Sequence, residues 1–225
     1  MWWTGLVDLG CRYAIDALAA DRLALLNDDC LWDHAGFEAL SELIDASPRM
    51  IVCSQVRDRE SGLPIFTGGL VDRSGRFVAR ALPDGGSNPA SRQVVWSGGQ
   101  GVLFSTEVFS TVGGFDPVAF PHYCGDLDFC LRARRRGIPT FYCAESVVLN
   151  DTSSTGVTIR REGTDFGTVA RSLLSRRSPY YVRDNLRLYL RHGGVRAPLG
   201  LAHLYFIWAG SSLMRLLRGA GAWPR

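Results

Sequence analysis

The stretch "LALLNDDC", residues 23–30, joins a strand pattern directly to a pair of carboxylates. Its first four residues are apolar and form the short run that is typical of a buried strand. The next three, Asn27, Asp28 and Asp29, carry polar groups that an apolar core excludes unless they are paired. Two explanations fit this pattern. Either the carboxylates end a strand where a ligand binds, or Asn27 and Asp28 begin a turn and Asp33 caps the next helix.

Strand and helix patterns alternate along the first 150 residues. Apolar runs typical of strands occur at 23–26, 50–56 and 140–149, and helical patterns occupy 33–46 and 126–136. Residues 63–82 read as a hairpin or two short strands. This alternation predicts an α/β fold with a mixed, mostly parallel sheet flanked by helices. In such sheets ligands bind beyond the carboxyl ends of the strands, which is where Asp28 and Asp29 follow their strand.

The composition sets the class of protein. With 225 residues, 46% of them hydrophobic, the chain can bury a core as one domain with a C-terminal appendage. Its six cysteines form no C-x-x-C pair, which argues against a zinc ribbon or a thioredoxin-like site and favours a reduced, cytoplasmic compartment. The opening "MWWTGLVDLG" lacks the basic and long apolar segments of a secretory leader.

A second acidic cluster lies in "HYCGDLDFCLRARRRG", residues 122–137. Asp126 and Asp128 stand at the start of a predicted helix that ends in arginines, an arrangement that suits the helix dipole. The dipole does not explain why the preceding loop is rich in glycine, aromatic and histidine residues. The alternative is that one carboxylate serves as a general base.

Five motifs together carry a family resemblance: "WWTG", "LLNDD", "GGFD", "GDLDFCLRARRRG" and "FYCAESVV". Their order and spacing over most of residues 1–150 resemble family 2 glycosyltransferases, particularly rhamnosyltransferases of bacterial cell-envelope polysaccharides. The resemblance implies a GT-A-like domain at 1–160, in which a nucleotide-sugar donor lies across the sheet edge, and a basic helical tail at 161–225. It further implies inverting, Mg²⁺- or Mn²⁺-dependent sugar transfer to a cell-envelope glycan or lipid-linked saccharide.

The resemblance also assigns donor-site roles. Asn27, Asp28 and Asp29 match the family's D-x-D-type motif, in which Asp29 would ligate the metal and Asp28 would lie near the donor's ribose or sugar. Trp3 and Thr4 match a stretch near the donor pocket. Many relatives carry a metal-binding histidine after the last strand, and here Asn150 or Asp151 would replace it with an oxygen ligand.

The remaining roles concern the acceptor and the chemistry. Gly125 and Asp126 match the family's Glu-Asp motif with glycine in place of glutamate, so Asp126 would be the catalytic base and Asp128 would orient the site. The residues expected on the acceptor side are Trp96, Gly98, Gly99, His122 and Tyr123. The alternative for Trp96 is a core position beside a bulged strand.

Relatives begin with a strand, helix and strand that grip the nucleotide, and that segment would precede "WWTG". The sequence therefore resembles a glycosyltransferase that is truncated at its N-terminus. This leaves two further interpretations open. One is a non-catalytic remnant that binds sugar or a partner protein, and the other is a metal-dependent phosphohydrolase built on the four aspartates.

The C-terminal stretch is strongly basic, with ten arginines and one acid, Asp184, between Arg171 and Arg225. Residues 197–214 carry no formal charge if His203 is neutral, but proline, glycine and serine interrupt a segment that is marginal for the roughly 20 apolar residues of a membrane span. We expect a helix that lies on the inner, anionic membrane face and inserts residues 204–208. The alternative is a helix packed on the domain core or on a dimer partner. No recognition motif accompanies the arginines, so nucleic acid is not expected as a partner.

Overall fold

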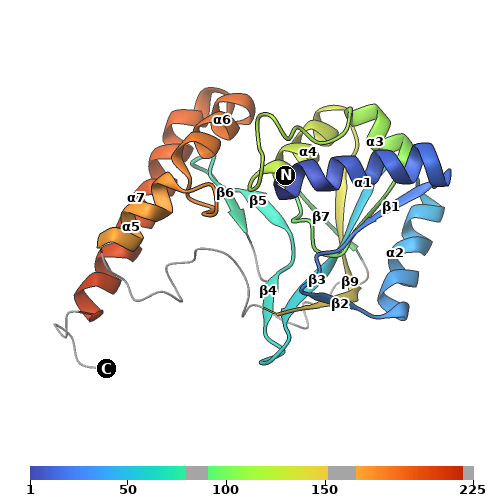
Figure 1. Cartoon of the computed structure of the whole chain (residues 1–225), viewed down its shortest axis with the longest axis horizontal. Coiled ribbons are helices and arrows are strands. Elements are labelled where there is room, and N and C mark those ends of the chain that lie inside the picture. The colour runs from blue at the N-terminus through green and yellow to red at the C-terminus, as the bar shows by residue number, and fades with distance from the viewer. Residues whose placement is uncertain (80–90, 152–165, 220–225) are drawn as a thin grey trace.

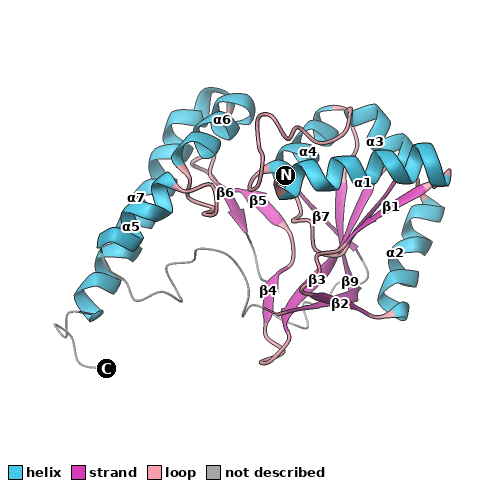
Figure 2. Cartoon of the chain, in the orientation of Figure 1, coloured by secondary structure: helices cyan, strands magenta, loops and turns pink. Residues whose placement is uncertain are grey.

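The computed structural model describes residues 1–79, 91–151 and 166–219. Within this part of the chain a seven-stranded sheet forms the centre (Figure 1, Figure 2). Its strands are β1 (Arg22–Leu25), β2 (Cys30–Trp32), β3 (Ile51–Asp58), β4 (Pro64–Phe66), β7 (Ser91–Val94), β8 (Val102–Ser105) and β9 (Thr140–Asn150). Two further strands, β5 (Gly69–Val71) and β6 (Phe77–Ala79), pair with each other in a hairpin.

The strand order is β1-β8-β3-β9-β2, with β4 beside β3 and β7 beside β9. The only parallel pair in the described sheet is β3 with β9, and the other pairs are antiparallel. The prediction of a mixed α/β sheet is confirmed, but the prediction that it is mostly parallel is wrong. A parallel neighbour needs a crossover, usually a helix. Between β3 and β8 the chain forms no such helix in its described part, and β8 therefore returns antiparallel to β3.

Four helices cover the sheet: α1 (Trp3–Leu18), α2 (His34–Ala46), α3 (Thr106–Val112) and α4 (Gly125–Arg135). Local signals set their ends. Asp33 caps α2 by accepting a hydrogen bond from the Gly36 amide at 2.7 Å, and the Cys30 amide donates to the Asn27 carbonyl at 3.1 Å, as the turn-and-cap explanation of residues 27–33 expects. Ser105 caps α3, which ends at Gly113 in the left-handed conformation that favours glycine.

Alternating side chains of the central strands divide the core into two layers. Ile51 and Cys53 pack in the cluster that includes residues of α1, α3 and α4, whereas Val52 packs with α2. Phe115 and Phe129 stack at 4.5 Å between ring centroids in the first cluster. This layer fixes α4, whose first turn carries the second acidic cluster.

The described tail contains α5 (Phe166–Leu174), α6 (Val182–His192), a 3-10 turn (Gly194–Arg196) and α7 (Ala197–Gly219). The tail is packed on the domain. Arg187 of α6 donates to the Ala119 carbonyl at 3.0 Å, and the Tyr189 hydroxyl accepts from the Phe77 amide at 3.2 Å. The predicted domain boundary at 160–161 lies outside the described residues.

Helix α7 differs from the expected surface helix in two of its five central apolar residues. Tyr205 donates to the Tyr180 carbonyl and Trp208 donates to the Ser172 hydroxyl, so both point toward the rest of the tail. Phe206 is 77% exposed and Ile207 is also exposed. Among the described residues, no helix combines the length and the apolar character that crossing a membrane requires.

Candidate active site

Trp3 joins two of the predicted donor and acceptor segments. Its indole nitrogen donates to the Asn27 side-chain oxygen at 2.9 Å. Its ring lies so close to Gly99 that a Cβ there would stand 2.2 Å from the Trp3 ring. Only glycine fits that position without movement of the ring. The loop after β1 and the loop before β8 therefore meet on one side chain.

Thr4 makes the next connection, from α1 to the loop that precedes α4 (Figure 1). It is completely buried, and its amide donates to the Pro121 carbonyl at 3.1 Å. A Cβ at Gly125 would lie 2.4 Å from the Thr4 hydroxyl oxygen. This contact gives a physical reason for the glycine at 125, because a glutamate there would have to displace Thr4.

Asp126 stands in the first turn of α4 with a half-buried side chain. One carboxylate oxygen accepts a hydrogen bond from the Leu127 amide at 2.8 Å, and the other lies next to Gly98. Burial raises the pKa of Asp126, although backbone amides, including that of Gly99, partly oppose the shift. A carboxylate with a raised pKa is a better proton acceptor than an ordinary aspartate.

Asp128, two residues further along the first turn of α4, occupies a different environment. It is completely buried, and its two oxygens are held by Arg132 at 2.7 Å, by Arg191 at 3.0 Å and by His192 at 2.8 Å. Burial alone would raise the pKa of Asp128, but the hydrogen bond from His192 and the charge of Arg132 outweigh it, and the pKa is lowered. The Asp128 carboxylate is thus enclosed by protein and connects α4 to α6.

The aromatic residues of the predicted acceptor side surround Asp126 and its loop. Trp96 packs on Phe66 at 5.2 Å and against the core, and His122 lies between Trp2 at 5.4 Å and Tyr123 at 4.6 Å. Burial lowers the pKa of His122, and the charge of Arg177 lowers it further. Within the described chain, the indole nitrogen of Trp96 and Nδ1 of His122 are buried without a hydrogen-bond partner. Both atoms are enclosed by protein, so a bound hydroxyl group would reach them only if the surrounding side chains moved.

The carboxylates after β1 line a cleft of about 490 Å³ together with Arg59 and Asp151. The Asp151 amide donates to the Asp29 carbonyl at 2.9 Å, which holds the two residues side by side, and Asp28 is exposed. Asn150, in contrast, is buried and donates to the Cys30 sulfur at 3.3 Å, so Asp151 is the residue that faces the cleft.

The cleft suits a cation that is bound mainly through its substrate. Mg²⁺ and related ions are usually held by one or two protein carboxylates together with substrate phosphates, and Asp29 and Asp151 supply that number. A search of the described residues finds no group of three or more side chains that would hold a metal unaided. Arg59 also lines this cleft, and its guanidinium group could bind a substrate phosphate. Sequence analysis does not identify Arg59, because the segment "VRDRE", residues 56–60, looks like an ordinary charged surface turn.

Comparison with models of protein families matches residues 9–176 to the family described as "Glycosyltransferase like family 2". This chain belongs to that family. No curated protein sequence matches it. Among solved structures, the fold is similar to that of GalNAc-T7, determined with UDP, GalNAc and Mn²⁺, with a TM-score of 0.54 at 13% identity. The match covers 67% of this chain and 30% of the GalNAc-T7 chain. At that identity the likeness concerns the fold alone, and it confirms the GT-A-like architecture.

Proposed function

We propose that this family 2 glycosyltransferase chain moves a sugar from a nucleotide-diphosphate donor to a hydroxyl of a cell-envelope glycan or lipid-linked saccharide. The observation that carries the proposal is the position of Asp126. Its half-buried carboxylate lies beside Gly98, and Gly99 connects it through Trp3 to Asn27 and the carboxylate cleft. A base and a donor-binding edge are thus joined in one site.

Asp126 is the proposed base. The acceptor oxygen gives its proton to the Asp126 carboxylate as it bonds to the anomeric carbon, and the bond from that carbon to the donor diphosphate breaks. Attack from the face opposite the leaving diphosphate inverts the anomeric centre. The raised pKa of Asp126 brings its proton affinity closer to that of the reacting group.

Asp29 and Asp151 are the proposed ligands of Mg²⁺ or Mn²⁺, with Asp28 and Arg59 beside them in the cleft. When bound, the cation would neutralise charge on the leaving diphosphate. Asn27 and Trp3 hold the edge of this cleft in place through their hydrogen bond. Their part is to position the donor.

The acceptor is proposed to lie against Trp96, His122 and Tyr123. A neutral imidazole at His122, favoured by its lowered pKa, can accept a hydrogen bond at Nδ1 or donate one there. Trp96 offers an indole N–H and a ring face for a sugar. We further propose rhamnosyltransferase-like specificity and a cytoplasmic enzyme held at the anionic inner membrane face by its basic tail.

Calorimetric titration with UDP and dTDP, with and without Mn²⁺, tests the donor site. We expect Mn²⁺-dependent binding that disappears in Asp29→Ala and persists in Asp16→Ala, a matched loss of an exposed acid outside the cleft. Absence of binding to the folded wild-type chain would contradict the proposal and favour a non-catalytic remnant. Release of phosphate without sugar transfer would instead indicate a phosphohydrolase.

A further inference from the structure

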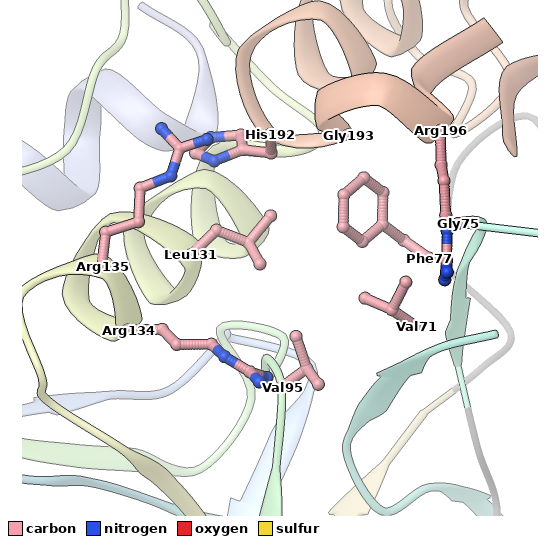
Figure 3. Close-up of a pocket in the computed structure, with 10 residues that line it drawn as sticks. All are labelled: Val71, Gly75, Phe77, Val95, Leu131, Arg134, Arg135, His192, Gly193 and Arg196. Carbon is pink, nitrogen blue, oxygen red and sulfur yellow. The ribbon is translucent and has the colours of Figure 1, made fainter. Parts of the chain in front are cut away.

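A second cavity, of about 520 Å³, lies at the other end of α4 from Asp126 (Figure 3). Its walls come from the last turn of α4, the β5–β6 hairpin and the turn before α7. Arg134 lies eight residues after Asp126, about 12 Å along a helix axis. The cavity is therefore separate from the candidate active site.

The cavity combines an apolar lining with cations. Figure 3 shows Leu131 and Phe77 on facing walls, with Arg134, Arg135 and Arg196 around them. Three arginines thus border the cavity from different sides, and no acidic side chain lines it in the described part of the chain.

Within the described residues, the three cavity arginines form no ion pair, in contrast to Arg132 and Arg191. Arg132 and Arg191 both bind Asp128, whereas no salt bridge to Arg134, Arg135 or Arg196 is found in the described part of the chain. The hydrogen bond of Arg135 goes to the Arg191 carbonyl, which leaves its charge uncompensated. Clustered like charges repel one another, and a bound anion would relieve that repulsion.

His192 adds a polar atom that lacks a partner. It lines the same cavity, its side chain is 1% exposed, and its Nε2 is bound to Asp128 at 2.8 Å. Its Nδ1 is buried and has no hydrogen-bond partner among the described residues. Buried polar atoms in folded proteins are nearly always satisfied by protein, water or ligand.

We propose that this cavity binds a phosphate group, in particular one carried on an apolar molecule such as an anionic lipid. Guanidinium groups bind phosphate oxygens through paired, charge-assisted hydrogen bonds. Phe77 and Leu131 offer contacts to the apolar part. Val195, within the turn that ends in Arg196, and Leu199, at the start of α7, are 99% and 58% exposed and would face the same lipid layer. This inference rests on the membrane association proposed above and names the cavity as the site that binds the anionic lipid.

The experiment compares two double variants of the full chain. The double variant Arg134→Gln with Arg196→Gln removes two of the positive charges that line the cavity. Both side chains are exposed and make no hydrogen bond within the described chain, so we expect the variant to fold. Arg49→Gln with Arg136→Gln removes two exposed charges outside the cavity as the matched control. Binding is measured by titration with inorganic phosphate and pyrophosphate, and by sedimentation with phosphatidylglycerol–phosphatidylcholine vesicles and with pure phosphatidylcholine vesicles.

We expect the cavity variant to bind at least about tenfold more weakly than the control variant, since each lost arginine removes charge-assisted hydrogen bonds. If the cavity variant loses binding only to the phosphatidylglycerol vesicles, the ligand is a lipid headgroup. If it loses binding only to phosphate or pyrophosphate, the ligand is a free anion. Equal binding by the two variants, or no binding of any probe by the wild type, would overturn the proposal. Mn²⁺-dependent UDP binding reports on the separate donor site, so the failure of one proposal is distinguishable from failure of the other.

Discussion

Substituting Asp128 with asparagine removes the charge at the point where α4 meets the tail. The carboxylate is completely buried, with Arg132, Arg191 and His192 as partners at 2.7, 3.0 and 2.8 Å. Removing one member of a buried ion pair costs about 3–5 kcal/mol, because the other charges stay behind uncompensated. Asparagine keeps one acceptor oxygen and Arg191 is 38% exposed, so we expect about 3 kcal/mol.

Urea unfolding followed by circular dichroism measures this loss, and for a chain of this size it corresponds to a fall in Tm of roughly 6–12 °C. The matched control is Asp116→Asn. Asp116 also binds Arg191, at 2.8 Å, but both side chains are partly exposed, and such pairs contribute about 0–1 kcal/mol. A loss for Asp128→Asn no larger than that of the control would refute the structural role given to Asp128.

Asp128 should also make the free energy of unfolding depend on pH in the acid range. The folded pKa of Asp128 lies below its ordinary value of about 3.9, so the group binds fewer protons when folded. The stabilisation that ionised Asp128 gives to the folded state is complete above the pKa that Asp128 has in the unfolded chain. It is lost as the pH falls through the pKa of Asp128 in the folded chain. The stability difference between wild type and Asp128→Asn should therefore shrink in strong acid.

Three further outcomes follow from the site. Asp126→Asn should lower the rate of sugar transfer roughly 10²–10⁴-fold and leave Mn²⁺-dependent UDP binding intact. The rate is measured with a mixture of nucleotide-sugar donors and an extract of envelope lipids. An unchanged rate would exclude Asp126 as the base. Because burial raises the pKa of Asp126 and the base acts deprotonated, kcat/KM should rise with pH through a pKa above that of an ordinary aspartate. Gly125→Ala should destabilise the chain by about 1–3 kcal/mol because its Cβ meets Thr4 at 2.4 Å, whereas Gly10→Ala, with open space around it, should not; equal thermal melts would contradict this.

Short-range signals in the sequence predict most of the elements. The Asp33 cap and the hairpin within 63–82 both appear where local chemistry places them. The sheet's direction is not encoded so locally. Whether β8 lies parallel or antiparallel to β3 depends on the connection between them, and helical periodicity elsewhere in the chain carries no information about it.

The site shows the same division. Motifs single out Asp126, Asp128 and the acids after β1, and the family resemblance gives Asp126 and Asp128 different roles, but the motifs contain no physical reason for that difference. The structure separates the two, because the partners that bury Asp128 come from residues 63 and 64 positions later in the chain. The choice of Asp151 over Asn150 is equally non-local, since it depends on the alternation of β9 and on the sulfur of Cys30.

Helix α4 links these features mechanically. Its first turn carries Asp126 and is tied to α6 through Asp128, and its last turn presents Arg134 and Arg135 to the second cavity. The buried ion cluster at Asp128 fixes the first turn of α4, two residues from Asp126, against α6. His192 contacts Asp128 through Nε2 and lines the arginine cavity as well. The tail is for this reason part of what holds the proposed base in place, in addition to being the surface that we propose meets a membrane.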